Sequence, residues 1–365
     1  MGARSDQSSN LSSILVLIGV NAAVALALTV GLELALGDWF ASYLPPAFAV
    51  VNQSYTGHQN LYDPPGDVLY VRDKYALRGV HEPLASIELV TVGGSTTDQS
   101  LISEGHTWQD ALRLQLGIRV ANAGVDGMSS FGHIVAVSDW LHRLPNFHPK
   151  LYLHYIGVND ASLSKTPHRW DRPGEEWGIL QIIKRRSFVV GALKKLFRSP
   201  ERIEVSHKGV TADEATSEMQ EVAVDKRPIK GFIEAVYEPN LRKLLALHRE
   251  RNEAVILVSQ TANPAIVRWT SGAAFVSAKH PDLEEWAMAL GMINGATERI
   301  CREGADICRF SDLAARVRFE ARDFYDLVHS TPSGAYKIGT FFAKELAPMF
   351  RGSLSAVEGR EPRVQ

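Results

Sequence analysis

The stretch Ile87-Glu88-Leu89-Val90-Thr91-Val92-Gly93-Gly94-Ser95-Thr96-Thr97 determines how we expect this chain to fold. Its first part is an apolar run interrupted by Glu88, which predicts a buried strand ending at the two glycines. Ser95 then lies where a strand gives way to a helix, at the edge of the sheet where open α/β folds bind ligands. Its hydroxyl can cap a helix or act as a nucleophile, and the two roles are compatible.

Four further strand-like runs occur downstream, and helical patterns separate them. The strands are expected near 119–123, 151–156, 254–259 and 306–310, and the helices at 107–117, 131–143, 234–251, 283–304 and 333–348. Strands that alternate with helices form parallel sheets covered by helices on both faces. We therefore expect an α/β fold, a three-layer α/β/α sandwich around a mainly parallel five-stranded sheet.

Two of these strands end in residues that can bind an anion. The strand at 119–123 is followed by Gly124, and the strand at 151–156 runs on to Asn159. If the strands lie side by side, the N–H groups of Ser95 and Gly124 and the side-chain amide of Asn159 can point at one oxygen, which would make an oxyanion hole. Glycine and asparagine are also common in turns, so a purely structural role stays open.

The C-terminal stretch Tyr325-Asp326-Leu327-Val328-His329 places a carboxylate and an imidazole three residues apart. In a tight turn the carboxylate can hold one ring nitrogen and leave the other to accept a proton from Ser95. An Asp-x-x-His motif also arises by chance, as a solvated turn with a helix cap. Together with Ser95 it predicts a nucleophile, a base and an orienting carboxylate.

The order of these motifs resembles the SGNH hydrolase family, also called GDSL-like esterases, over about residues 86 to 348. The shared pattern is a serine after the first strand, a glycine after the second, Gly-x-Asn-Asp after the third and Asp-x-x-His near the C-terminus. The resemblance implies a flavodoxin-like fold with Ser95 as nucleophile, His329 as general base and Asp326 as its orienter. It also implies that Gly124, Asn159 and the Ser95 amide are the oxyanion-hole donors.

The chain departs from that family at one position. Where the family usually has Gly-Asp-Ser, this sequence has Gly93-Gly94-Ser95, so the carboxylate before the serine is missing. The motif Gly-Gly-Ser-Thr-Thr also resembles SGNH-like proteins of bacterial cell-envelope and exopolysaccharide systems. That resemblance implies an envelope glycan as the source of the ester.

The composition is that of a globular protein with an apolar N-terminus. The 365 residues are 45% hydrophobic and 22% charged, with a formal net charge of −2. No glycine-rich phosphate loop or basic–aromatic patch occurs in the sequence, so we expect no nucleic acid as partner. Ile14 to Leu32 is an apolar run interrupted only by glycines, Asn21 and Thr29. It is long enough to cross a membrane and longer than the core of a signal peptide, which favours an uncleaved anchor over cleavage near Ala35-Leu36-Gly37.

The basic residues around this run predict its orientation. Arg4 precedes the run and the next basic residue after it is Arg72, which favours a cytoplasmic N-terminus and an extracytoplasmic, periplasmic catalytic domain. The expected organisation is a cytoplasmic segment at 1–12, an anchor at 13–36, a linker and N-terminal extension at 37–85, a hydrolase domain at 86–350 with an insertion at 160–232, and a tail at 351–365. The basic amphipathic run Ile182 to Arg198 predicts a lid, an interfacial helix or a solvated surface helix.

The cysteines and histidines give no metal pattern. Cys301 and Cys308 can close a small disulfide loop in an oxidising compartment or remain two buried thiols, and the sequence leaves both open. No further Cys or His lies near them to complete a zinc site. We expect no metal and no cofactor, and we interpret as structural a set of histidines without metal-site spacing: His106, His133, His142, His148 and His154.

The sequence therefore predicts a membrane-anchored serine esterase of the cytoplasmic membrane. It would hydrolyse an ester, such as an O-acetyl group on an envelope glycan, through an acyl-enzyme. An O-acyltransferase that moves the acyl group to a saccharide hydroxyl would use the same residues, and a non-catalytic scaffold in polysaccharide assembly is a third hypothesis. The expected partners are an acylated saccharide or other ester substrate and the membrane, while the acyl chain, the oligomeric state and any protein partners stay open.

Overall fold

The computed structural model describes residues 5–40, 49–81, 83–162, 171, 183, 186–197, 217–270 and 273–354. These residues divide into two compact units. One contains Met1–Leu44 and Gly174–Glu201, and the other contains Pro45–Pro173 and Arg202–Gln365. Most of the expected insertion at 160–232 lies outside the described residues, so the lid hypothesis for that segment stays a prediction.

The larger unit is built on a five-stranded parallel sheet. Its strands, in spatial order, are β10 (Cys308–Ser311), β7 (Ala254–Val258), β5 (Leu151–Tyr155), β3 (Leu89–Gly93) and β4 (Val120–Gly124). Counted along the chain, this order is 2-1-3-4-5, the flavodoxin-like arrangement. The predicted fold class is therefore confirmed.

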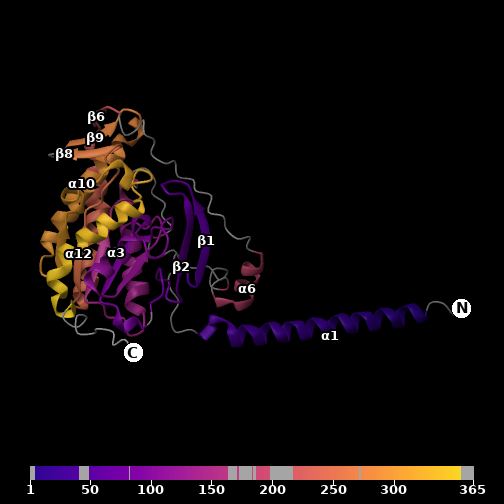
Figure 1. Ribbon diagram of the computed structural model, residues 1–365. Helices are drawn as coiled ribbons and strands as arrows, with labels where there is room; N and C mark the ends of the chain where they lie inside the picture. The colour runs from indigo at the N-terminus through magenta and orange to yellow at the C-terminus, as the bar shows by residue number, and fades with distance from the viewer. Residues whose placement is uncertain are drawn as a thin grey trace. The chain divides into compact units, whose positions relative to one another are not determined.

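Helices cover both faces of this sheet (Figure 1). One hydrophobic cluster joins a face of the sheet to α3 (Trp108–Leu116) and α12 (Pro332–Leu354), which pack on each other. The second cluster joins the opposite face to α4 (Ser130–Val135), α8 (Lys226–Phe232), α9 (Glu238–Glu250) and α10 (Glu284–Glu303). Side chains alternate between the two faces because successive residues of a strand point in opposite directions. Leu153 of β5 belongs to the first cluster. Val255 of β7, which pairs with the residue before Leu153, belongs to the second.

Local sequence explains where the helices begin and end. Thr107 accepts a hydrogen bond from the Asp110 N–H while Asp110 accepts one from the Thr107 N–H, so the two form a capping box at the start of α3. Gly117 ends the helix with a left-handed φ of 64°. The expected helix at 131–143 is α4 continued by a π-helical turn, Ala136–Trp140, and a 3-10 turn, Leu141–Arg143. Two shorter helices are α2 (Ser95–Asp98) and α11 (Leu313–Arg316).

Two small antiparallel sheets were not foreseen from the sequence. A hairpin of β1 (Gln53–Gln59) and β2 (Gly66–Arg72) occupies the stretch expected to be a linker and extension. Single bridges from Arg78 to Arg72 and to Asn122 connect the hairpin to the edge strand β4. The other sheet contains β6 (Met219–Glu221), β9 (Ala273–Ser277) and β8 (Val267–Thr270).

A disulfide joins Cys301, in α10, to Cys308, the first residue of β10. The two Cα atoms are 5.3 Å apart. This resolves the alternative that the sequence left open. The bridge fastens α10 to the edge strand that it covers.

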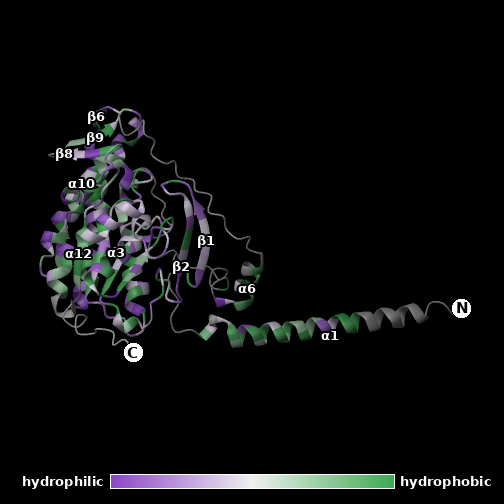
Figure 2. Cartoon of the chain, in the orientation of Figure 1, coloured by the Kyte–Doolittle hydropathy of each residue, from purple (hydrophilic) through white to green (hydrophobic). Residues whose placement is uncertain are grey.

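The smaller unit contains the long N-terminal helix α1 (Ser5–Leu36), whose described side chains are mostly hydrophobic (Figure 2). Its segment Leu15–Leu36 is 22 residues long with a mean hydropathy of 2.4, enough to cross a membrane by length and composition. A signal sequence would meet the same criteria. Near its end, Glu33 accepts hydrogen bonds from the Ser187 hydroxyl and the N–H groups of Phe188 and Val189. It thereby caps the amphipathic helix α6 (Phe188–Phe197).

Candidate active site

Ser95 is the first residue of α2, directly after β3 and its two glycines. The chain has no room for side chains before it. A Cβ atom on Gly94 would lie 2.3 Å from the amide nitrogen of Asn159, and one on Gly93 would lie 2.1 Å from the Thr97 hydroxyl. The absence of a carboxylate at position 94 therefore has a steric reason in this chain, because Asn159 occupies the space.

The predicted base and orienter meet Ser95. Nε2 of His329 lies 2.7 Å from the Ser95 hydroxyl, and Nδ1 of His329 lies 2.7 Å from Oδ2 of Asp326. The other carboxylate oxygen of Asp326 accepts hydrogen bonds from the N–H groups of Val328 and His329. These two bonds fix the turn, so the short spacing in sequence becomes a continuous chain from carboxylate to imidazole to hydroxyl.

The surroundings of Asp326 keep its carboxylate ionised. Burial raises the pKa of Asp326, but the hydrogen bonds and charge of His329 outweigh it and hold the pKa below its ordinary value. Both side chains are mostly shielded, with exposed fractions of 12% for Asp326 and 13% for His329. The ring of Tyr325 stacks on that of His329 at 5.5 Å between centroids. The imidazole is therefore held between an aromatic wall and a carboxylate.

The three expected oxyanion donors differ in their surroundings. The Ser95 N–H is at the start of a helix, where N–H groups have no acceptor within the helix. The Asn159 amide donates to the Met128 carbonyl at 2.9 Å. The Gly124 N–H donates to Oδ1 of Asn122 at 2.8 Å, and a Cβ atom on Gly124 would lie 2.3 Å from the Asp98 nitrogen. The glycine at 124 is thus required where α2 packs on β4.

The turn after β4 also lies near the expected oxyanion donors, and the sequence interpretation missed it. The Met128 N–H donates to the Val125 carbonyl, and Gly127 between them has a positive φ of 73°. Because Asn159 binds the Met128 carbonyl, this turn lies beside the Asn159 amide. The signal was present in the dipeptide Asp126-Gly127, which is typical of tight turns.

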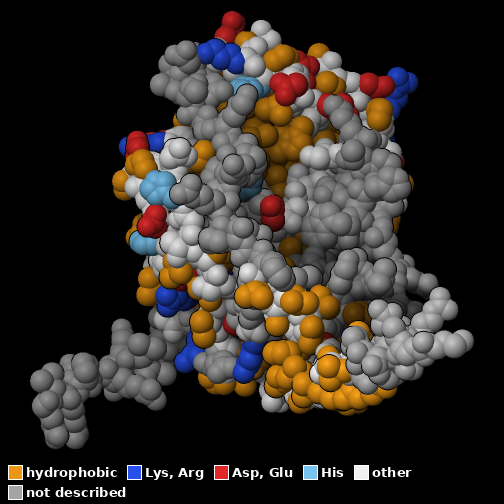
Figure 3. All heavy atoms as spheres, turned by 90° about the vertical axis from the view of Figure 1, so that its right-hand side faces the viewer, with side chains coloured by type: hydrophobic (Ala, Val, Ile, Leu, Met, Phe, Trp, Pro, Cys, Tyr) orange, Lys and Arg blue, Asp and Glu red, His pale blue; other side chains and the backbone are white. Residues whose placement is uncertain are grey.

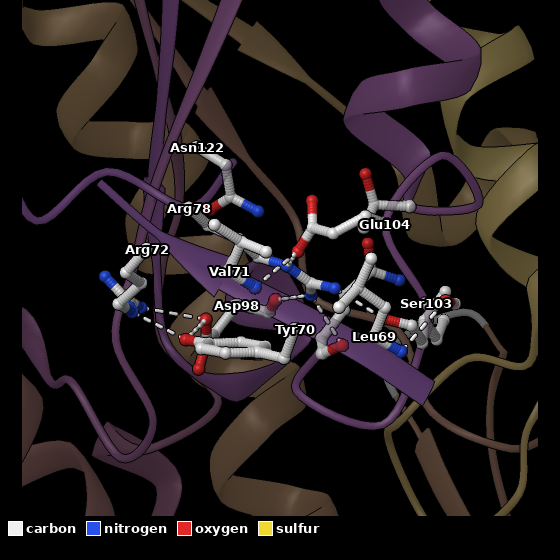
Figure 4. A network of polar contacts seen from close by, with 12 residues as sticks. Leu69, Tyr70, Val71, Arg72, Arg78, Asp98, Ser103, Glu104 and Asn122 are labelled. Carbon is white, nitrogen blue, oxygen red and sulfur yellow. Dashed lines mark hydrogen bonds and ion pairs between the residues drawn. The ribbon is translucent and has the colours of Figure 1, made fainter. Parts of the chain in front are cut away.

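Buried charges from the hairpin and from the turn after it hold the segment that follows Ser95 (Figure 4). Arg72 Nη2 and the Tyr70 hydroxyl both bind Oδ1 of Asp98 at 2.8 Å, and Arg72 also donates to the Gly124 carbonyl. Arg78 donates to the carbonyls of Asp98, Gln99 and Ile102 and pairs with Glu104 at 2.9 Å. Burial, and next the neighbouring Asp98 carboxylate, raise the pKa of Tyr70. The stretch expected to be a linker therefore supplies the groups that hold α2.

A cavity of about 1220 Å³ opens at the carboxyl ends of β7 and β10. Its lining includes Trp269 and Phe319 with the charged side chains of Arg268 and Arg318. Hydrophobic side chains line a hollow at the level of the small sheet β6–β9–β8 (Figure 3). The turn that contains Asp326 and His329 is hydrogen-bonded to this region, because the Asn263 N–H donates to the Leu327 carbonyl at 2.8 Å.

No family model and no curated protein matches the chain. Among solved structures it is similar to a catalytic mutant of an acetylxylan esterase from Geobacillus stearothermophilus, at 13% identity and a TM-score of 0.40, over 71% of this chain and 94% of that one. It is also similar to a member of the lipolytic protein G-D-S-L family from Veillonella parvula, at 12% identity and a TM-score of 0.38, over 70% of this chain and 96% of that one. At these values, the likenesses carry no residue roles over to this chain.

Proposed function

We propose that this protein is a serine esterase that works through an acyl-enzyme. The observation that carries the proposal is the unbroken chain of hydrogen bonds from Asp326 through His329 to Ser95, with both links at 2.7 Å. A serine hydroxyl is a weak nucleophile unless an adjacent base takes its proton. Here the base is in contact and its far nitrogen is held by a carboxylate, which are the two requirements for activation.

The proposed reaction follows from this geometry. As the Ser95 oxygen attacks the ester carbonyl, its proton passes to Nε2 of His329, and Asp326 stabilises the imidazolium that forms. The alcohol leaves with that proton, and water then attacks the acyl-enzyme with His329 as base again. The Ser95 N–H and the Asn159 amide are the proposed donors to the tetrahedral oxyanion. Gly124 is the third expected donor, and in this structure its N–H donates to Oδ1 of Asn122.

The experiment is a matched pair of serine variants in the full-length protein. Ser95→Ala should abolish hydrolysis of p-nitrophenyl acetate and labelling by a fluorophosphonate probe, while the melting temperature stays unchanged. Ser86→Ala is the control, because its hydroxyl lies at an exposed position and donates to the nearby Pro83 carbonyl. Undiminished turnover or labelling of Ser95→Ala would refute the proposal. A fully folded wild-type protein that never reacts with the probe would favour the scaffold hypothesis instead.

The finer proposal is that the substrate is an O-acetylated glycan outside the cytoplasmic membrane. It is supported by the membrane-sized helix α1 and by the disulfide, since disulfides persist in oxidising compartments. In this proposal α1 is a single-pass anchor and the larger unit is periplasmic. Release of acetate from acetylated saccharides, measured with and without an acceptor saccharide, distinguishes hydrolysis from acyl transfer. Protease protection of the larger unit in spheroplasts would contradict the proposed orientation.

A further inference from the structure

A row of buried histidines crosses the face of the sheet that α4 and α9 cover. Nδ1 of His133, in α4, lies 2.9 Å from Nδ1 of His154, in β5. Nε2 of His154 lies 3.0 Å from Nε2 of His248, in α9. All three side chains are fully buried, at 0% exposure. Charged imidazoles would be costly in such a place, and burial lowers the pKa of His133 to about 3, so the row is neutral.

The row ends in a cluster of three potential metal ligands. Oε2 of Glu253 lies 2.8 Å from Nδ1 of His248 and 2.8 Å from Nε2 of His142. The three ligand atoms all lie within 4.8 Å of one another. His248 is fully buried, whereas the side chains of His142 and Glu253 are 9% and 12% exposed. The cluster is therefore nearly enclosed, with a narrow opening on the side of His142 and Glu253.

The cluster is remote from the nucleophile. Glu253 precedes Ala254, the first residue of β7, which pairs with Leu151 at the start of β5. Ser95 lies two residues after Gly93, the last residue of β3, at the other end of the parallel strands. The two sites thus occupy opposite edges of the sheet. The histidine cluster has no part in the proposed ester chemistry.

One buried polar atom of the row, Nε2 of His133, has no hydrogen-bond partner among the residues that the structure describes. The ring of Tyr152 lies against that of His248, with centroids 4.5 Å apart, and its hydroxyl interacts with the Glu253 carboxylate. Buried polar atoms without partners are costly and rare in folded proteins. This atom lies at the end of the row away from Glu253.

We propose that His142, His248 and Glu253 bind a divalent transition-metal ion of the zinc type. Two imidazole nitrogens and one carboxylate oxygen are a common zinc ligand set, with water as the fourth ligand in open sites. Tetrahedral bonds of roughly 2.0–2.1 Å place ligand atoms about 3.3 Å apart. The two 2.8 Å pairs therefore separate by about half an ångström to admit the ion. Such a shift is within the reach of side-chain rotation.

The rest of the row provides the support that a metal-bound imidazole needs. When Nδ1 of His248 binds the ion, its Nε2–H donates to His154, whose Nδ1–H donates to His133. In the metal-free state donor and acceptor exchange roles in each of these hydrogen bonds, and the Nδ1–H of His248 donates to Glu253. Each ring stays neutral in both arrangements, so the ion is bound by a change of tautomers along the row.

The Arg251 guanidinium faces this cluster. Nε of Arg251 lies 3.9 Å from Oε1 of Glu253, the oxygen that turns away from the two imidazoles, and its Nη1 donates to the His142 carbonyl. The guanidinium thus approaches the outer oxygen of the carboxylate and leaves Oε2 for the ion. Ligating carboxylates are usually held in this way by an outer partner.

The test measures metal binding by the full-length protein in detergent after chelator treatment. Titration with Zn²⁺ alone should reveal one saturable site per chain, and Co²⁺ alone should give the visible absorption spectrum of a tetrahedral nitrogen–oxygen site. His142→Gln and Glu253→Gln should each weaken Zn²⁺ binding at least tenfold. His148→Gln is the matched control, because this histidine is exposed and lies outside the cluster. Ser95→Ala should bind Zn²⁺ like the wild type, which separates this site from the esterase.

Two results would overturn the proposal. The first is that the wild-type protein binds no Zn²⁺, or binds only Zn²⁺ that the control variant His148→Gln fails to bind. The second is a folded His142→Gln or Glu253→Gln variant that binds as tightly as the wild type. If these variants do not fold, the wild type alone still decides, because Zn²⁺ must then raise its melting temperature and Mg²⁺ must not. An unchanged melting temperature would show that the row is a hydrogen-bond network only.

Discussion

Replacing Arg72 with Met should destabilise the protein more than any surface change of charge. The Arg72 guanidinium binds Oδ1 of Asp98, the Tyr70 hydroxyl and the carbonyls of Ala76 and Gly124. The side chains of Arg72 and Asp98 are only 4% and 7% exposed. Methionine fills a similar volume without charge, so Arg72→Met leaves the Asp98 carboxylate buried without its cation.

The expected magnitude follows from that burial. Breaking a buried ion pair by removing one partner costs about 3–5 kcal/mol. With a change of roughly 2–4 °C per kcal/mol for domains of 150–250 residues, the melting temperature should fall by roughly 6–20 °C. Arg227→Met is the matched control, since Arg227 pairs with Asp225 on the surface and its side chain is 90% exposed. Water replaces that partner, so little change is expected.

The assay is thermal and urea unfolding of the full-length variants in detergent, followed by tryptophan fluorescence. Esterase turnover measured below the melting transition gives a second readout, because Asp98 is the last residue of the helix that Ser95 begins. We expect the rate constant kcat to fall in Arg72→Met, whereas Arg227→Met keeps it. A folded Arg72→Met variant with the stability and kcat of Arg227→Met would refute the idea that the hairpin holds the nucleophile.

Three further predictions concern the site and its support. Asp326→Asn should lower kcat roughly 10⁴-fold with little change in KM, because the amide cannot hold the reactive tautomer of His329. The folded-state pKa of Asp326 lies below the ordinary value of about 3.9, so its carboxylate contributes stability that is present above that pH and is lost as the pH falls through the lower value. In Asp326→Asn, an acid titration of the free energy of unfolding should lack this component. Identical titration curves for the variant and the wild type would contradict the pKa shift. Gly94→Ala should lower kcat at least tenfold because its Cβ atom would meet the Asn159 amide at 2.3 Å, whereas Gly295→Ala, with open space around it in α10, should keep full activity; equal activities would show that the Asn159 amide is not confined. Removing the disulfide by Cys301→Ser with Cys308→Ser should lower the free energy of unfolding by roughly 2–3 kcal/mol, and a reducing agent should remove the difference from the wild type; a difference that survives reduction would mean that the serines themselves disturb the packing.

The main sheet could be predicted from the sequence because most of its strand residues are buried. In each of β3, β4 and β5 all five residues are buried. Strands buried in this way have mostly apolar sequences, which can be recognised in the local sequence. The small helix α2 and the turn at Asp326 likewise carry local signals, in their glycines and in the Asp-x-x-His spacing. The structure brings together the serine, histidine and aspartate that those signals indicated.

The hairpin and the histidine row could not be predicted in the same way. β1 is half exposed and contains polar residues at most positions, so it lacks a strong apolar pattern. The partners of Arg72 and Arg78 are separated from them by about twenty or more residues and by a turn whose path is not encoded locally. His142, His248 and Glu253 come from a turn after α4, from α9 and from the start of β7, so no spacing in the sequence reveals them.

The hairpin makes the catalytic helix depend on the chain that precedes the main sheet. Arg72 binds the carboxylate of Asp98 and the carbonyl of Gly124, which ends β4. Arg78 binds the carbonyls of Asp98, Gln99 and Ile102. A helix of four residues has too few internal hydrogen bonds to hold Ser95 against His329 by itself. Because these arginines bind the last carbonyl of α2 and the carboxylate of Asp98 together, buried charge from outside the parallel sheet holds Ser95 in position. The segment between α1 and β3 therefore supports the proposed nucleophile.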